Sequence, residues 1–196
     1  LPRFKPAVLV GPESNRQILV SHRNKFLWRS ETDPVTRLLR RGVLVVDGAE
    51  HDELRGQMDP LLQRRHVLPH IQAFWDLTGQ VTQTWQDGEQ RDLLVEMRKA
   101  ALQILYATVF KVDLSPEIDR LWEPILTLLK HISPGPWIFF PGLKPDHKVR
   151  QAIEVMDEHL YRLIQDRRQT IAEQPEWAGS HDLLTRLIQT EGMEDG

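Results

Sequence analysis

A histidine and an arginine separated by one helical turn are the residues of this sequence best suited to chemistry. His51 and Arg55 are four positions apart, so on a helix their side chains share one face and can converge on a common anion. An arginine fork forms charge-assisted hydrogen bonds with a carboxylate, and a histidine ring N–H donates another. The pair therefore predicts a site for two carboxylates of one ligand. Taken alone, such a pair is most often a solvated helix face.

The residues before this pair predict the helix that must position it. An apolar run over residues 42–46 ends at Asp47, a suitable N-cap, and Glu50 stands three positions later in the capping-box place. With a helix beginning there, Asp52 and Glu53 are expected to face away from the anion site.

The same segment resembles the C-helix region of the cytochrome P-450 family, the haem-thiolate monooxygenases. The resemblance is carried by residues 47–55 (DGAEHDELR) followed by residues 58–60 (MDP). In that family the histidine and the arginine bind the haem propionates. The resemblance therefore implies that haem is the cofactor and that His51 and Arg55 are cofactor-binding residues.

The order of the predicted elements also follows this family, and the resemblance covers essentially all 196 residues. It implies a mainly α fold with a short β segment at the N-terminus. This would be the N-terminal half of a soluble bacterial cytochrome P-450, from its first strand through its F and G helices. Residues 1–196 are then expected to form a single partial domain that lacks the half running from the I helix to the C-terminus.

The residues that would complete such an active site are expected outside this sequence. In that family the oxygen-activating acid and alcohol pair, the Glu-x-x-Arg motif and the cysteine-containing haem loop all lie further along the chain than the segments matched here, and this chain has no cysteine. A haem-thiolate enzyme needs that cysteine as its iron ligand. The resemblance implies an intact parent that hydroxylates an apolar small molecule with dioxygen and electrons from a redox partner. This chain alone is expected to be inactive, with no catalytic residue or metal ligand and with haem absent or weakly bound.

Two segments are candidates for the wall of a substrate pocket. By the same resemblance, the loop over residues 26–46 and the connector over residues 133–143 border that pocket, and their aromatic and aliphatic content suits an apolar substrate. The plainer alternative is that the aromatic residues of the connector fill a gap in the core. The substrate-pocket candidates are Phe26, Trp28, Leu39, Val43, Leu44, Trp137, Phe139 and Phe140.

Apolar positions that repeat every three or four residues predict that most of the chain is helical. Helices are expected over residues 13–24, from Asp33-Pro34, from 67 to 85, from 93 to 108, from 115 to 132, from about 145 for more than 25 residues, and from about 180. Ala100 and Ala101 allow close approach of a neighbouring helix, so the helices at 67–85 and 93–108 are expected to pack together. The opening run over residues 1–12, bounded by Pro and Gly, predicts the short strand.

Two further groups of residues have competing interpretations. His66 and His70 are four positions apart, but Pro69 disturbs the first turn and the sequence offers no third ligand nearby, so a helix start is favoured over a zinc site. A group of arginines makes the early part of the chain basic, which either attracts an acidic redox partner or solubilises the surface. These are Arg37, Arg40, Arg41, Arg55, Arg64 and Arg65.

Composition restricts the partner classes. The net charge of −3 argues against a nucleic-acid partner. There is no apolar run long enough for a membrane span and no secretory signal pattern, so a cytoplasmic protein is expected. A second hypothesis is a non-catalytic helical interaction module or oligomerising fragment. Its uncovered apolar faces would then lead to self-association or to pairing with the missing C-terminal half.

Overall fold

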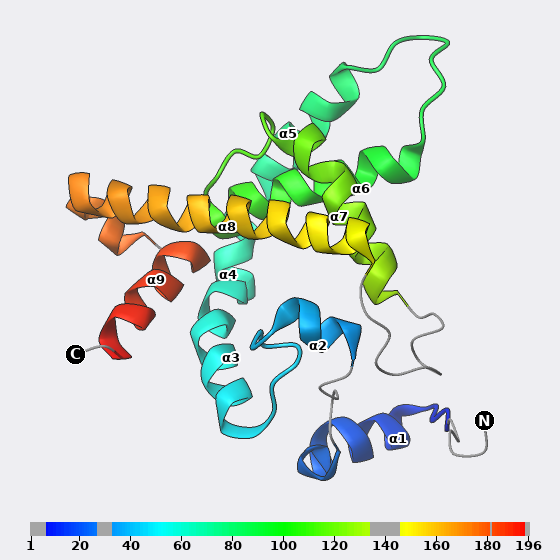
Figure 1. The fold of residues 1–196 in the computed structure, drawn as a ribbon, viewed down its shortest axis with the longest axis vertical. Coiled ribbons are helices and arrows are strands. Elements are labelled where there is room, and N and C mark those ends of the chain that lie inside the picture. Colours follow the sequence, from blue (N-terminus) through cyan, green and yellow to red (C-terminus); the bar gives the residue numbers. More distant parts are fainter. Residues whose placement is uncertain (1–6, 27–32, 134–145, 181, 195–196) are drawn as a thin grey trace.

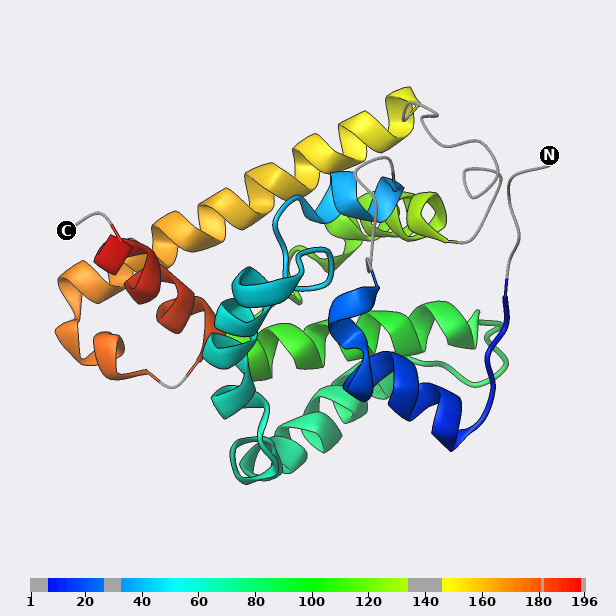
Figure 2. The ribbon, with the colours of Figure 1, turned by 90° about the horizontal axis from the view of Figure 1, so that it is seen from below.

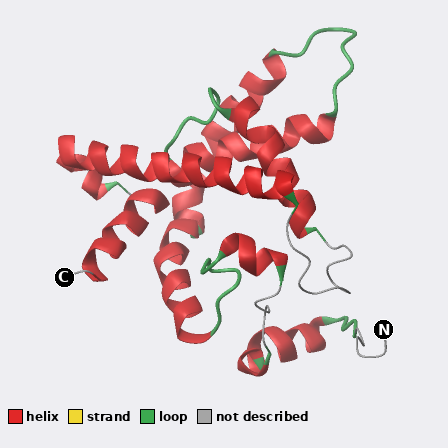
Figure 3. Ribbon diagram, in the orientation of Figure 1, coloured by secondary structure: helices red, strands yellow, loops and turns green. Residues whose placement is uncertain are grey.

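The computed structural model describes residues 7–26, 33–133, 146–180 and 182–194, the last four without their side chains. Within these ranges every regular element is helical and no strand occurs (Figure 3). The prediction of a mainly α fold is confirmed for this part of the chain. No helix in the described ranges is both long enough and apolar enough to cross a membrane.

The N-terminal third consists of short helical pieces that lead into one longer helix. They are α1 (Pro12–Arg16), the π-helical turn η1 (Gln17–Ser21), the 3-10 turn η2 (Arg23–Lys25), α2 (Pro34–Leu39) and α3 (Gly48–Leu62). The helix expected over residues 13–24 is thus present as three consecutive pieces. Asp33 caps α2 as expected, because its carboxylate accepts a 2.8 Å hydrogen bond from the backbone N–H of Val35.

The short strand predicted at the N-terminus is not formed over its described part. Residues 7–10 have no regular secondary structure, and Val8 and Val10 are 86% and 83% exposed. A strand satisfies its backbone groups by pairing with another strand, and the described ranges hold no strand with which these residues could pair. Residues 1–6 of that prediction lie outside the described residues.

The rest of the chain forms longer helices that pack in pairs. They are α4 (Arg64–Val67), η3 (Leu68–His70), α5 (Ile71–Gln83), α6 (Leu93–Leu105), η4 (Tyr106–Phe110), α7 (Ile118–Ile132), α8 (His147–Glu173), η6 (Pro175–Gly179) and α9 (Leu183–Glu194). As predicted, α5 packs on α6, and α8 has the expected length, with 27 residues. The most extensive contact between two helices joins α7 to α8. Seen from below, α8 lies along one edge and α5 along the opposite edge, with α2, α3 and α6 between them (Figure 2).

The core lies where η4 and α7 meet α8. Tyr106, Leu114, Ile118 and Leu121 form its buried centre, and partly buried side chains of α6 and α8 pack around them. Leu121 has no exposed surface, so the apolar stripe read from the sequence faces inward as expected.

One face of α6 carries uncovered apolar side chains. Leu94, Met97 and Leu105 are 59%, 38% and 45% exposed, and Ala101 lies exposed between them at the same helical spacing. Ala100 on the inward face is only 3% exposed. The helix therefore presents apolar residues both to the core and to the outside.

Among the described residues, three arginine–carboxylate pairs tie α8 to other segments along its length, as α8 crosses the molecule in Figure 1. They are Arg40 with Asp157, Arg162 with Glu117, and Arg167 with Asp182. Their partners come from the end of α2, from the residue before α7 and from the residue before α9. These pairs fix α8 against three separate parts of the chain.

The pair with Asp182 is buried and extensively hydrogen-bonded. The side chains of Arg167 and Asp182 are 5% and 0% exposed, and Nη1 lies 2.7 Å from Oδ2. The other guanidinium nitrogen donates to the backbone carbonyl of Phe110 at 2.7 Å. The carboxylate also accepts hydrogen bonds from the hydroxyls of Ser180 and Thr185. One guanidinium therefore joins the end of η4 to the start of α9.

Candidate functional site

The predicted helix under His51 and Arg55 is present, but its first turn is closed differently from the prediction. Asp47 has extended backbone angles at the N-cap of α3, yet its side chain makes no capping hydrogen bond to the helix. Glu50 instead pairs with Arg41, whose Nε lies 2.8 Å from Oε1. The N-cap position was therefore predicted correctly, and the capping box was wrong.

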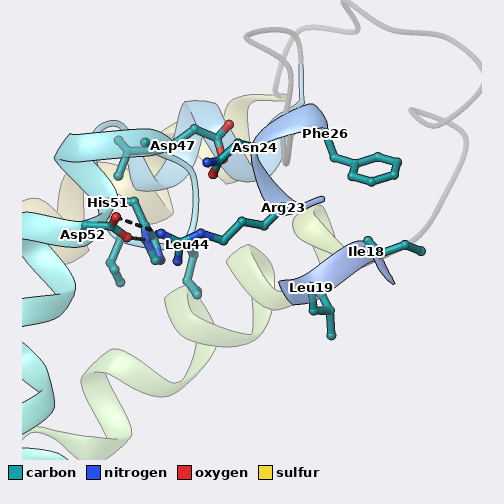
Figure 4. A pocket seen from close by; sticks show the side chains of 12 residues that line it. Ile18, Leu19, Arg23, Asn24, Phe26, Leu44, Asp47, His51 and Asp52 are labelled. Atoms are coloured by element: carbon teal, nitrogen blue, oxygen red, sulfur yellow. Dashed lines mark hydrogen bonds and ion pairs between the residues drawn. The ribbon is translucent and has the colours of Figure 1, made fainter. Parts of the chain in front are cut away.

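His51 lies in a short chain of polar side chains that joins α3 to η2. Its Nδ1 is 3.2 Å from Oδ1 of Asp52, and the other oxygen of that carboxylate accepts a 3.0 Å hydrogen bond from Arg23 (Figure 4). The hydrogen bond with His51 and the positive charge of Arg23 lower the pKa of Asp52 below its ordinary value of 3.8. This carboxylate is thus held ionised between two nitrogen-bearing side chains.

Asp52, which was expected to face away from the anion site, contacts His51 through its carboxylate. Neighbouring positions on a helix do not normally face each other. Here Arg23 stands beside the start of α3, and it draws the short Asp52 side chain to the same side as His51. Because 29 positions separate Arg23 from Asp52, helix periodicity in the sequence could not indicate this contact.

Arg55 has its own carboxylate partner on the solvent side of α3. Its Nε lies 2.6 Å from Oδ1 of Asp59 one turn later, and both side chains are about half exposed. His51 and Arg55 therefore contact different carboxylates. Their joint role in binding one ligand stays a prediction.

A pocket of about 570 Å³ opens beside His51, a size within the usual range for small-molecule sites. Apolar side chains form one part of its wall, and the Arg23–Asp52–His51 chain forms another (Figure 4). Its lining residues are Ile18, Leu19, Arg23, Asn24, Phe26, Val43, Leu44, Val46, Asp47, Gly48, His51 and Asp52. Their mix of apolar and charged groups suits a mostly apolar ligand with a polar edge.

The structure brings together part of the predicted substrate wall. Phe26, Val43 and Leu44 line the pocket together with His51, although the ring of Phe26 points away from His51 in Figure 4. Leu39 is half-buried at the end of α2 and does not line this pocket. The other candidates, Trp28, Trp137, Phe139 and Phe140, lie outside the described residues.

Sequence reasoning did not find the contribution of η1 and η2 to this site. Ile18, Leu19, Arg23 and Asn24 line the pocket from these two turns. Ile18 and Leu19 give an apolar pattern in the sequence, but it indicates only a helix face. The signal that was missed is tertiary, because the turns become part of the site only by lying against the start of α3.

The side chains of His51 and Arg55 are suited to binding carboxylates, such as the propionates at the edge of a haem. The side chains of His51 and Arg55 are 38% and 50% exposed, and their present partners are carboxylates, the same group that a propionate offers. No group of three side chains able to hold a metal occurs among the described residues. The chemistry of His51 and Arg55 therefore fits carboxylate groups, such as the propionates of haem.

The basic surface predicted for the early part of the chain is partly neutralised. Arg40, Arg41 and Arg55 pair with Asp157, Glu50 and Asp59. Arg64 and Arg65 are exposed, and neither has an ion-pair partner in the described part of the chain. Both interpretations of this surface, solubility and an acidic partner, stay open.

Comparisons with known proteins agree with a cytochrome P-450 relationship and go no further. The chain is 27% identical over 122 residues to proteins of Mycobacterium bovis and Mycobacterium tuberculosis, each named "Putative cytochrome P-450 139". The match covers 62% of this chain and 28% of each relative, so this chain matches little more than a quarter of their length. No family model and no solved structure matches the chain.

Proposed function

We propose that this chain supplies the haem-propionate site and part of the substrate wall of a cytochrome P-450 monooxygenase. The parent enzyme hydroxylates an apolar small molecule with dioxygen and with electrons from a redox partner. The observation that carries the proposal is the position of His51 beside a largely apolar 570 Å³ pocket, within a segment that resembles the family's C helix. Similarity to the mycobacterial proteins supports it.

In this proposal, the chain's residues bind and orient the cofactor's edge. His51 would donate a ring N–H to one propionate, and Arg55 would bind the other in place of its present partner Asp59. Asp52 would orient the ring through Nδ1, and the opposite ring nitrogen would donate to the propionate in the form of the ring that carries hydrogen on both nitrogens. Haem with a cysteine ligand supplies the activation of dioxygen. Because residues 1–196 contain no cysteine, the thiolate would come from residues beyond them, and this chain alone is inactive.

The remaining parts of the proposal concern partners and location. Ile18 and Leu44 would contact the apolar body of the substrate. Arg64 and Arg65 offer an exposed basic surface to an acidic redox partner. The protein acts in the cytoplasm.

The test is haem binding followed by absorption spectroscopy. The chain is titrated with haemin, alone and with the C-terminal part of its parent, and spectra are recorded after reduction and addition of carbon monoxide. A thiolate-type Soret band that requires both parts supports the proposal. Replacing either residue, by His51→Gln or Arg55→Gln, is expected to weaken haem binding about fivefold, because each change removes one partly exposed charge-assisted contact. Arg98→Gln, an exposed arginine on α6, is the control and should change nothing.

Failure of haem uptake in both preparations would favour the second candidate function. The uncovered face of α6 suits a helical interaction module that self-associates or pairs with the C-terminal half. A second copy packed there would be disrupted by Met97→Glu, which places a charge on that face. Molar mass measured by light scattering over a range of concentrations distinguishes this from a chain that stays monomeric.

A further inference from the structure

A second pocket lies on the other half of α3, away from His51. The end of α3, the turn α4–η3, α5, η4 and the start of α9 meet there and enclose about 230 Å³. It shares no lining residue with the pocket at His51. Its lining residues are Met58, Leu61, Leu62, Arg65, His66, Val67, Pro69, His70, Phe74, Thr108, Val109, Lys111 and Leu183.

The ionisable side chains among the described residues that line this second pocket are all basic. Four of its lining residues carry basic nitrogen, and none of the described lining residues carries a carboxylate. Arg65 and the ring of His70 have no hydrogen-bond or ion-pair partner within the ranges that the structure describes. Lys111 donates only to the neutral hydroxyl of Ser180, at 3.1 Å. The pocket therefore presents donors and positive charge that no protein carboxylate in its wall satisfies.

A metal is a poorer match than an anion for these nitrogens. His66 and His70 are the pair with zinc-like spacing, but zinc needs further nitrogen, sulfur or carboxylate ligands. The remaining polar lining residues are an arginine, a lysine and a threonine, and cationic side chains repel a metal ion. The described residues contain no cluster of three metal-ligating side chains.

The rest of the wall is apolar and comes from distant parts of the chain. Phe74 on α5, Val109 in η4 and Leu183 on α9 meet the end of α3 here. An apolar wall with a basic rim is complementary to a molecule with an apolar body and one anionic end. The volume admits about eight groups the size of a water molecule, at roughly 30 Å³ each. A short acyl chain has that size.

We propose that this second pocket binds a small amphipathic carboxylate, with its apolar body against Phe74, Val109 and Leu183. Arg65 and Lys111 hold the carboxylate, and His70 completes the basic rim. The inference stands independently of haem binding at His51, because the two pockets have no residue in common.

Octanoate is the probe, and its binding to the purified chain is measured by isothermal titration calorimetry. Arg65→Gln is expected to weaken octanoate binding about fivefold, because it removes one exposed charge contact with the carboxylate. The control is Arg64→Gln, which removes a neighbouring exposed arginine that does not line the pocket and should leave binding unchanged. Acetate and octan-1-ol, which keep only the charge or only the apolar body, are each expected to bind more weakly than octanoate. His51→Gln should leave octanoate binding unchanged.

Three results would overturn the proposal. The first is no measurable binding of octanoate. The second is an equal loss in Arg64→Gln and Arg65→Gln, which would show diffuse attraction to a basic surface. The third is equal binding of octan-1-ol and octanoate, which would show an apolar groove that ignores charge. Val109→Phe, which fills the pocket, provides a second check once circular dichroism shows unchanged helicity, and it should also reduce binding.

Discussion

Replacing Arg167 by methionine is expected to cost more stability than any exposed ion-pair substitution in this chain. The substitution keeps an unbranched side chain of similar length and removes the charge. It leaves the Asp182 carboxylate, which has no exposed surface, without a compensating cation, and it leaves the Phe110 carbonyl without its donor. Removing one partner of a buried ion pair costs about 3–5 kcal/mol, because the other charge stays buried.

The size of the effect in a melting experiment follows from the length of the chain. For a protein of this size, 1 kcal/mol shifts the melting temperature by about 2–4 °C, so Arg167→Met should lower it by about 6–20 °C. Arg40→Met is the matched control, because the side chain of Arg40 is 57% exposed and its pair with Asp157 is worth about 0–1 kcal/mol.

Thermal unfolding followed by far-ultraviolet circular dichroism measures both variants. The double variant Arg167→Met with Asp182→Leu removes both charges together and is expected to be more stable than Arg167→Met alone. If Arg167→Met lowers the melting temperature no more than Arg40→Met does, the buried pair does not have the energetic role assigned to it. A double variant no more stable than the single one would refute the argument from an uncompensated charge.

Two further predictions concern α8 and α6. Burial lowers the pKa of His159 below its ordinary value of 6.5, more than the nearby Glu117 carboxylate raises it, so the unfolded chain takes up a proton where the folded chain does not. The free energy of unfolding should therefore fall as the pH is lowered from about 7.5 to about 5.5. His159→Gln should make that fall smaller, whereas His147→Gln, at the exposed start of α8, should not change it. Urea titrations at both pH values measure the free energy of unfolding. Asp92→Ala removes the carboxylate that caps α6 and should cost about 1 kcal/mol in urea unfolding, whereas Asp92→Asn should keep most of the stability.

The helices were predictable because their apolar side chains repeat with the helical period. The packing of α5 on α6, the inward stripe of α7 and the length of α8 all follow from that repeat, since burying one face of a helix requires it. The strand was not predictable in the same way. An apolar run over residues 7–10 becomes a strand only when another strand lies beside it, and a local pattern contains no information about that partner.

In the candidate site too, the residues set by local spacing could be predicted, and those brought in by contacts between distant segments could not. His51 and Arg55 were found from their spacing on one helix, a local property. Arg23 was missed because its contact with Asp52 spans 29 positions, and the capping box failed because Arg41 outside the helix binds Glu50. The residues that line the second pocket come from α3, η4, α9 and the segments between them. The sequence therefore showed His66 and His70 as a pair, but it could not show that distant basic residues lie beside them.

The three ion pairs on α8 also determine where this helix can stand along its own axis. Asp157, Arg162 and Arg167 follow one another at intervals of five residues, over about 15 Å at 1.5 Å per residue. A shift of α8 by one turn, about 5.4 Å, would move every one of these groups past its partner at once. Sliding of α8 is therefore opposed at three points along its length, and most strongly at the buried pair of Arg167 with Asp182.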